Sequence, residues 1–246
     1  VEASPLRGVI RVVRKFHEST ITQDIILEKD KPTVDFDTTV DWHEREKVLK
    51  AEFPVDIRSR NASCEIAHGA AEYPTHYNTS YDQAKFEFCA HKWADLSEGG
   101  YGASIINDCK YGYNVHDNVM KITLLRGPIL PDPVGDIGMH SFRYSFYPHA
   151  GTWRDADTVR LGFEENIRLD SEFIKANGGS DIGHTFAKID GDSVILDAVK
   201  PAQDGNGIIV RMYESETRHC TAKAWFELNY SKVIECNLME CDEHEI

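Results

Sequence analysis

The sequence lacks long apolar runs and sustained helical periodicity. None of its 246 residues belongs to a stretch approaching the ~20 apolar residues that a membrane-spanning helix requires. Apolar residues do not keep the 3.6-residue spacing of an amphipathic helix, and we expect only two short helical turns, near Tyr81–Lys85 and Trp153–Asp157. These absences argue against a helical membrane protein and leave a strand-rich fold.

Basic residues are outnumbered, with 27 Lys and Arg against 41 Asp and Glu, for a net charge of −14. Such a surface repels nucleic-acid phosphates and anionic membranes, so we expect neither as a partner. The first 15 residues mix four basic side chains with short apolar runs, which is not the pattern of a signal peptide. The chain opens in mid-pattern, as a segment of a longer protein would.

None of the six cysteines forms a C-x-x-C pair. Their loose spacing in a long chain favours reduced thiols in a cytoplasmic protein over a disulfide framework. Three N-x-S/T sequons begin at Asn61, Asn78 and Asn229, but such tripeptides are common by chance.

One cysteine lies close to a histidine in the sequence. Cys109 and His116, with Asp108 and Asp117 beside them, combine residue types that bind zinc. The favoured interpretation is a hairpin with an incidental thiol and polar turn residues. We therefore predict no metal site in this chain.

Apolar and polar residues alternate in several short segments, which is typical of strands with one buried face. Residues 34–42 show this best, with one slip at Thr39, and Gly205 lies within a strong hairpin turn signal at 203–207. The other predicted strands cover residues 8–14, 121–126, 142–147, 193–199, 208–214, 221–228 and 232–238. The prediction is an all-β chain: a large antiparallel sandwich at 1–155, a connector at 156–185 that contains the polar stretch 177–180, and a smaller C-terminal β-sandwich at 186–246.

Three longer blocks of residues fall in order along the chain, at Val40–Glu44, His91–Glu98 and Asn107–Tyr113. Shorter ones fall at residues 49–50, 53–55, 74–76, 78–80, 101–102, 124–126, 131–133, 148–149, 200–202 and 210–214. Together, in order along nearly the whole chain, these blocks resemble α-mannosidases of glycoside hydrolase family 38, of the cytosolic and vacuolar type. The chain departs from the family at Tyr73, Tyr81 and Lys85, and it has no closing "PFEI"-like segment.

This resemblance implies a retaining, zinc-dependent exo-α-mannosidase acting on α-mannosides or mannose-containing oligosaccharides. In that family an N-terminal α/β barrel holds the zinc, with His and Asp ligands, and the nucleophilic Asp. None of the eleven histidines here is followed two residues later by Asp, the spacing of an early ligand pair of the barrel. We therefore expect no catalytic residue and no zinc ligand in this chain, which by itself should be inactive.

The resemblance assigns this chain to the C-terminal β region, a large antiparallel super-sandwich followed by a smaller β-sandwich. Its expected role is to shape the rim of the substrate pocket and to support its own N-terminal catalytic domain, with homo-oligomer contacts left open. The alternatives are a stand-alone carbohydrate-binding module and a structural scaffold without a ligand.

The resemblance also suggests which residues serve that role. Asp108, Lys110, Tyr111 and Arg126 are expected at the substrate-pocket edge or the domain interface, against the alternative of an ordinary hairpin with a surface salt bridge. Among the four tryptophans, Trp42 sits in an alternating strand and should be core. Trp93 is the candidate for a sugar contact.

Overall fold

The computed structural model describes residues 2–167, 169–173, 183, 185–241 and 244–245. The chain divides into two compact units, Val1–Leu169 and Asp170–Ile246. This boundary falls inside the predicted connector at 156–185, and the predicted three-part division stays a prediction. The polar stretch 177–180 lies outside the described residues.

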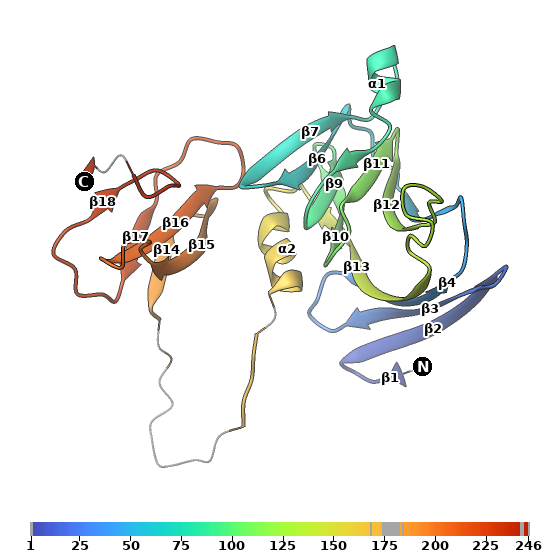
Figure 1. The fold of residues 1–246 in the computed structure, drawn as a ribbon, viewed down its shortest axis with the longest axis horizontal. Helices are drawn as coiled ribbons and strands as arrows, with labels where there is room; N and C mark the ends of the chain where they lie inside the picture. The colour runs from blue at the N-terminus through green and yellow to red at the C-terminus, as the bar shows by residue number, and fades with distance from the viewer. Residues whose placement is uncertain (1, 168, 174–182, 184, 242–243, 246) are drawn as a thin grey trace. The chain divides into compact units, whose positions relative to one another are not determined.

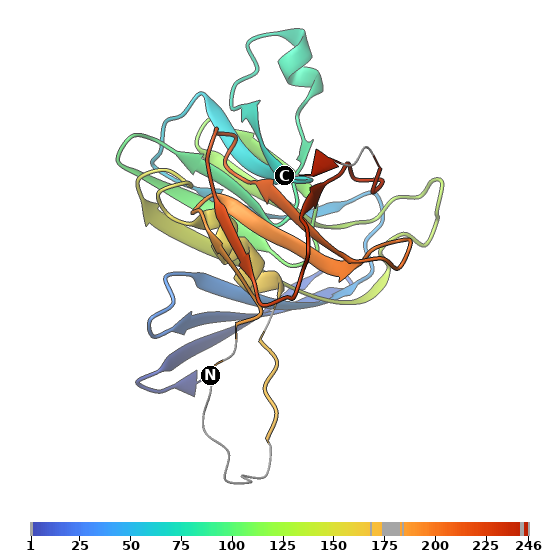
Figure 2. The same ribbon diagram turned by 90° about the vertical axis from the view of Figure 1, so that its left-hand side faces the viewer.

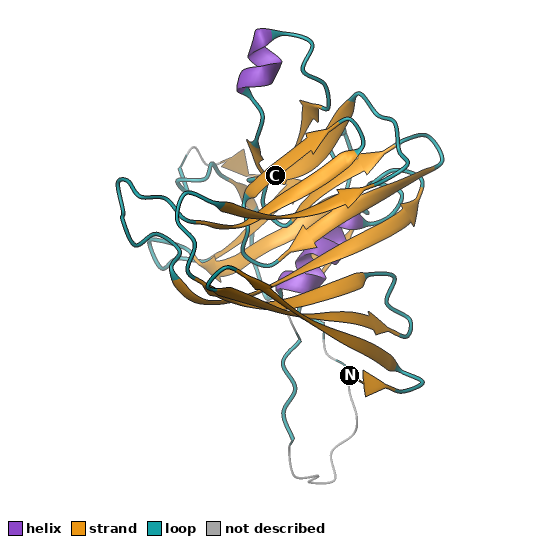
Figure 3. Cartoon of the chain, turned by 90° about the vertical axis from the view of Figure 1, so that its right-hand side faces the viewer, coloured by secondary structure: helices purple, strands orange, loops and turns teal. Residues whose placement is uncertain are grey.

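The first unit consists of two antiparallel sheets (Figure 1). One has nine strands in the order β1-β2-β3-β4-β13-β10-β9-β6-β7, and the other has four in the order β5-β12-β11-β8. Strands dominate the unit, as Figure 3 shows, which confirms the predicted all-β class. The strand bounds are β1 Glu2–Ala3, β2 Arg7–Phe16, β3 Ser19–Glu28, β4 Val34–Trp42, β5 Val48–Pro54, β6 Asn61–Ile66, β7 Gly69–Pro74, β8 Phe88–Cys89, β9 Trp93–Ser97, β10 Tyr101–Asn107, β11 Gly112–His116, β12 Val119–Arg126 and β13 Gly138–Ala150.

Strand β4 shows how the alternating pattern produces this sheet. Val40 and Trp42 are buried, whereas Thr39, just before them, is exposed. The slip in the pattern does not interrupt the strand, because Thr38 takes the inward position and accepts a hydrogen bond of 3.0 Å from Gln23 Nε2. A polar group in a core position is tolerated when it is hydrogen-bonded.

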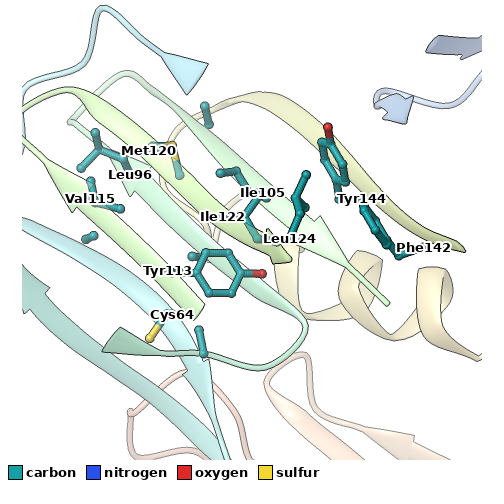
Figure 4. Close-up of a cluster of buried hydrophobic side chains, with 14 of the residues drawn as sticks. Cys64, Leu96, Ile105, Tyr113, Val115, Met120, Ile122, Leu124, Phe142 and Tyr144 are labelled. Atoms are coloured by element: carbon teal, nitrogen blue, oxygen red, sulfur yellow. The ribbon is translucent and has the colours of Figure 1, made fainter. Parts of the chain in front are cut away.

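Apolar side chains from both sheets fill the space between them (Figure 4). Phe53 from the small sheet stacks on Phe146 of the large sheet at 5.0 Å between ring centroids. Tyr73, a departure from the family pattern, stacks on Phe88 at 4.4 Å and so joins the two sheets as well. The core role predicted for Trp42 is confirmed, since that side chain is 1% exposed.

The described residues of the first unit also form two helices. Helix α1 (Ser80–Ala84) begins with a capping box, in which Thr79 and Asp82 each satisfy the other's backbone N–H. Helix α2 (Thr158–Asn166) follows a run of turns at residues 153–157. The second predicted helical turn, Trp153–Asp157, therefore ends immediately before the helix begins.

Helix α2 packs on the face of the large sheet that is opposite the sandwich core. Gly162 permits this approach, because a Cβ at that position would lie 3.1 Å from Trp93 Cδ1. Ion pairs hold the same helix: Glu165 meets Lys31 and Arg143, which both also pair with the buried Asp35.

The second unit contains three two-stranded antiparallel sheets among its described residues, consistent with the predicted smaller β-sandwich. The turn predicted at 203–207 does join β15 to β16, and Gly205 and Gly207 adopt the positive φ angles of 77° and 130° that this turn requires. The predicted strand at 232–238 is reduced to two residues. The pairs are β14 (Ala187–Asp190) with β17 (Lys223–Phe226), β15 (Val194–Pro201) with β16 (Ile208–Glu214), and β18 (Ile234–Glu235) with β19 (His244–Glu245).

In the described parts of the chain, neither helix has the length or apolar character needed to cross a bilayer.

Candidate functional site

A tight turn between β10 and β11 carries three of the predicted site residues. Asn107 organises it from a nearly buried position: its side-chain oxygen accepts hydrogen bonds from the backbone N–H groups of Cys109 and Lys110. Its amide nitrogen donates to the carbonyl of His91 at 2.9 Å and to the hydroxyl of the buried Tyr113. The turn is therefore anchored to the core.

The predicted residues extend outward from this turn. Lys110 Nζ lies 4.3 Å from the centroid of the Phe142 ring, a cation–π contact. The Asp108 carboxylate accepts a 3.1 Å hydrogen bond from the backbone N–H of Arg143. Tyr111 is 59% exposed, and its ring meets His91 edge-on at 5.7 Å. The turn thus presents a phenol and an ammonium group on a rigid base.

Arg126 ends strand β12. Its backbone N–H donates to Asp136 at 2.6 Å, and its exposed guanidinium has no ion pair among the residues that the structure describes. The next residue must be glycine, because a Cβ at Gly127 would lie 2.1 Å from the carbonyl oxygen of Glu44. The position of Arg126 is therefore set by backbone contacts, and its side chain is free to bind a carboxylate or hydroxyl groups.

The sheet register brings Arg126 to the same end as the turn. The last β11–β12 pair is Tyr113 with Ile122, and a Cβ at Gly112 would lie 3.2 Å from Thr123. Because the two strands are antiparallel, the end of β12 at Arg126 lies at the same end of the hairpin as the turn that precedes Gly112. Asp108, Lys110, Tyr111 and Arg126 consequently share one rim of the sandwich.

Trp93 does not join this rim. It is completely buried, 4.8 Å from Trp153 between ring centroids, beneath helix α2. No face of its ring is open to a sugar, which corrects the expectation of a sugar contact there. The burial depends on a helix that follows 65 or more positions later, so the local sequence around Trp93 held no signal for it.

Cys109 and His116 are too far apart to bind one metal ion. His116 ends β11 and Cys109 lies in the turn before that strand, and the four steps from Gly112 to His116 alone span about 13 Å. The Cys109 residue is exposed, but partial desolvation of its thiol, followed by the adjacent Asp108, raises the pKa of that thiol to about 11, which disfavours the thiolate that zinc requires. His116 instead stacks on Tyr77 at 4.0 Å. Across the described residues, no group of three or more His, Cys, Asp and Glu side chains is arranged to hold a metal.

Sequence reasoning missed a buried polar cluster beside α2. Asp95 and His149 are each 1% exposed at the side chain, with 2.7 Å between His149 Nε2 and Asp95 Oδ2. Ser104 donates to the same carboxylate oxygen at 2.7 Å, and Ser97 donates to the other. Gly102 makes room for the cluster, because a Cβ there would lie 2.5 Å from His149 Cε1. With no opening to solvent, this cluster is suited to stabilising the fold and not to binding substrate.

The second unit has a polar hollow of about 380 Å³. Acidic and basic side chains line it together, including Asp190, Asp192, Arg218 and Lys223. None of these residues belonged to the predicted site.

Comparison with known proteins identifies the family. The model of the family "Glycosyl hydrolases family 38 C-terminal domain" matches residues 1–134, and that of the "Glycosyl hydrolases family 38 C-terminal beta sandwich domain" matches residues 193–246. Alpha-mannosidase G of Dictyostelium discoideum is 37% identical over 250 residues, which cover 98% of this chain and 23% of that protein. Alpha-mannosidase of Saccharomyces cerevisiae is 42% identical over 226 residues, which cover 84% of this chain and 20% of that protein.

A solved structure shows the same fold. The crystal structure of an alpha-mannosidase from Enterococcus faecalis V583 matches with a TM-score of 0.78 and 15% identity, covering 92% of this chain and 30% of that one. This chain spans about a fifth to a quarter of the length of the curated relatives above. Because the first family model alone covers more than half of it, the chain belongs to glycosyl hydrolases family 38, as a C-terminal β region of that family.

Proposed function

We propose that this chain is the C-terminal region of a cytoplasmic, retaining, zinc-dependent exo-α-mannosidase that acts on α-mannosides or mannose-containing oligosaccharides. The observation that carries the proposal is family membership, together with relatives that are named α-mannosidases and are four to five times longer than the matched region. Six free thiols agree with a reducing compartment.

In this proposal the chemistry resides outside the chain. A retaining glycosidase requires two carboxyl groups about 5–5.5 Å apart, one as nucleophile and one as acid and base. We assign these groups and the zinc ligands to the N-terminal catalytic domain. The separation of Cys109 from His116 supports that assignment, because the one Cys/His pair considered for zinc does not fit a shared ion.

The role proposed for this chain is to form part of the pocket edge or the interface with the catalytic domain. Asp108, Lys110, Tyr111 and Arg126 suit that role because they share one rim and project from backbone held by the core. Arg126 offers a rigid fork of donors, and Tyr111 offers a hydroxyl group on an exposed ring.

The test uses Arg126→Ala and Tyr111→Phe in the full-length enzyme. A hydrogen bond to a charged group contributes about 1.5–3 kcal/mol, so we expect Arg126→Ala to lower kcat/KM roughly 10- to 100-fold. The control is Arg160→Ala on helix α2, where the side chain is 74% exposed and pairs with Glu164. We expect wild-type turnover from it.

Three outcomes separate the interpretations. A lower kcat/KM with unchanged melting supports the pocket edge. A lower melting temperature with normal specific activity supports the domain interface. Wild-type values for both would mean that the rim is an ordinary hairpin surface.

A stand-alone carbohydrate-binding module is the second candidate, and the polar hollow of the second unit is the observation in its favour. Calorimetric titration of the isolated chain with mannose oligosaccharides tests it. Binding that is lost in Asp192→Ala would support the module, and an absence of heat would leave the pocket-rim proposal.

A further inference from the structure

The outer hairpin of the large sheet exposes an apolar face. β2 and β3 lie at the edge of the sheet, blue in Figures 1 and 2. Ile10 is 63% exposed, Phe16 is 43% exposed, and Leu27 is 57% exposed. The register and the two-residue alternation of strands place all three on one face of the hairpin.

This face continues the core face of the sheet. Ile10 pairs with Ile25, which pairs in turn with Phe36, whose ring lies 5.7 Å from Phe53 inside the sandwich. The four-stranded sheet contributes Phe53 but does not extend over β2. The hairpin is thus an apolar extension of the core face, and the described residues of the first unit leave Ile10, Phe16 and Leu27 of this face exposed.

The same hairpin also has an open edge. β1 pairs only with Gly8 and Val9, so residues 10–16 of β2 have no strand on their outer side among the described residues. Alternate residues of this stretch direct backbone N–H and C=O groups to the open side, which is a template for another strand. An apolar face and an open edge together suit an extended segment that pairs and packs at once.

The charge of the edge argues against a second copy as that segment. Two β2 strands paired antiparallel about a two-fold axis would place Arg11 opposite Lys15 in the register that uses the whole open edge, residues 10–16. Like charges directly opposite each other are destabilising. Arg14 and Lys15 have no ion pair in the described part of the chain, so a segment carrying carboxylates would complement them.

We propose that the region of the full-length enzyme that precedes this chain docks here, with an extended segment added to the β2 edge and apolar side chains over Ile10, Phe16 and Leu27. The inference rests on the proposed function for the existence of that region, since the matched relatives hold about four-fifths of their length elsewhere. It goes further by naming the contact surface and the chemistry of its occupant.

Hydrogen–deuterium exchange of the isolated chain and of the full-length enzyme tests the proposal. We expect peptides from residues 10–16 to exchange roughly tenfold or more slowly in the full-length enzyme. Equal exchange in the two proteins would overturn docking. This outcome can be told apart from failure of the proposed function, because the enzyme could still be active. Slow exchange of the outward-facing amides of residues 10–16 already in the isolated chain would also overturn docking. It would favour a second copy if the exchange depends on protein concentration, and the second unit if it does not.

A matched pair of variants tests the face itself. Ile10→Ser removes an apolar side chain from the proposed contact, whereas Val13→Ser removes one of similar exposure, 57%, from the opposite face of the same strand. In the full-length enzyme we expect Ile10→Ser to restore fast exchange at residues 10–16 and Val13→Ser to leave it slow. Equal effects of the two variants would show that this face is not the contact.

Discussion

The buried pair of Asp95 and His149 allows a test of how strongly burial changes the contribution of one contact to stability. The chain provides an internal control, because His43 Nε2 lies 2.8 Å from Asp41 Oδ1 and His149 Nε2 lies 2.7 Å from Asp95 Oδ2. The two contacts have nearly the same length. They differ in exposure: the side chains of the first pair are 42% and 46% exposed, and those of the second are 1% exposed.

We expect His149→Ala to destabilise the first unit by about 3–5 kcal/mol, because it removes one partner of the buried Asp95 carboxylate and leaves only the hydroxyl groups of Ser97 and Ser104 as donors. Water competes for both groups of the exposed pair, so His43→Ala should cost less than about 1 kcal/mol. For a unit of about this size, each kcal/mol shifts the melting temperature by roughly 2–4 °C, which predicts a decrease of about 6–20 °C against less than about 4 °C.

Differential scanning calorimetry of the two variants measures this difference, with Asp95→Asn as a third protein. Asp95→Asn creates no cavity but places an amide among groups that donate to the carboxylate, namely His149 and Ser104. It should therefore also destabilise the unit. Similar shifts for His149→Ala and His43→Ala would refute the reasoning, and a harmless Asp95→Asn would assign the loss in His149→Ala to the cavity alone.

Three further outcomes are expected. The isolated chain should not cleave a chromogenic α-mannoside with or without added zinc, and chelator-sensitive turnover above a buffer blank would contradict the assignment of the chemistry to another domain. Burial alone would raise the pKa of Asp35, but hydrogen bonds from Lys31, Thr33 and Ser145 outweigh it and lower that pKa. The stability that this carboxylate contributes is therefore present above about pH 4 and is lost on further acidification. Acid titration monitored by circular dichroism should show a shallower loss of stability for Asp35→Asn than for the wild type. Burial raises the pKa of the Cys64 thiol to about 12, so iodoacetamide at pH 8 should label the exposed Cys241 and spare Cys64 until urea unfolds the chain, and early labelling of Cys64 by mass spectrometry would contradict the packed core.

Local sequence was enough to predict the all-β class and the positions of many strands. Residues 34–42 and 208–214 were predicted to the residue, because alternation between a buried and an exposed face is written into consecutive positions. The turn at 203–207 was equally local, since glycine is needed where φ is positive. The role of Asn107 in the β10–β11 turn could also have been predicted locally, because an asparagine at the end of a strand commonly accepts hydrogen bonds from backbone N–H groups that follow it.

Which residues contact one another across the fold could not be predicted in the same way, because those contacts join distant parts of the chain. Asp95 and His149 are 54 positions apart, and their contact depends on β9, β10 and β13 lying side by side. Trp93 is buried by a helix that the sequence of its own strand does not indicate. Ile10 and Phe16 are exposed because the second sheet does not reach the hairpin that carries them. Alternation specifies that a strand has an apolar face, but what covers that face is set by partners distant in the chain. Local sequence therefore sufficed for the burial of Trp42 but not for the burial of Trp93 or the exposure of Ile10.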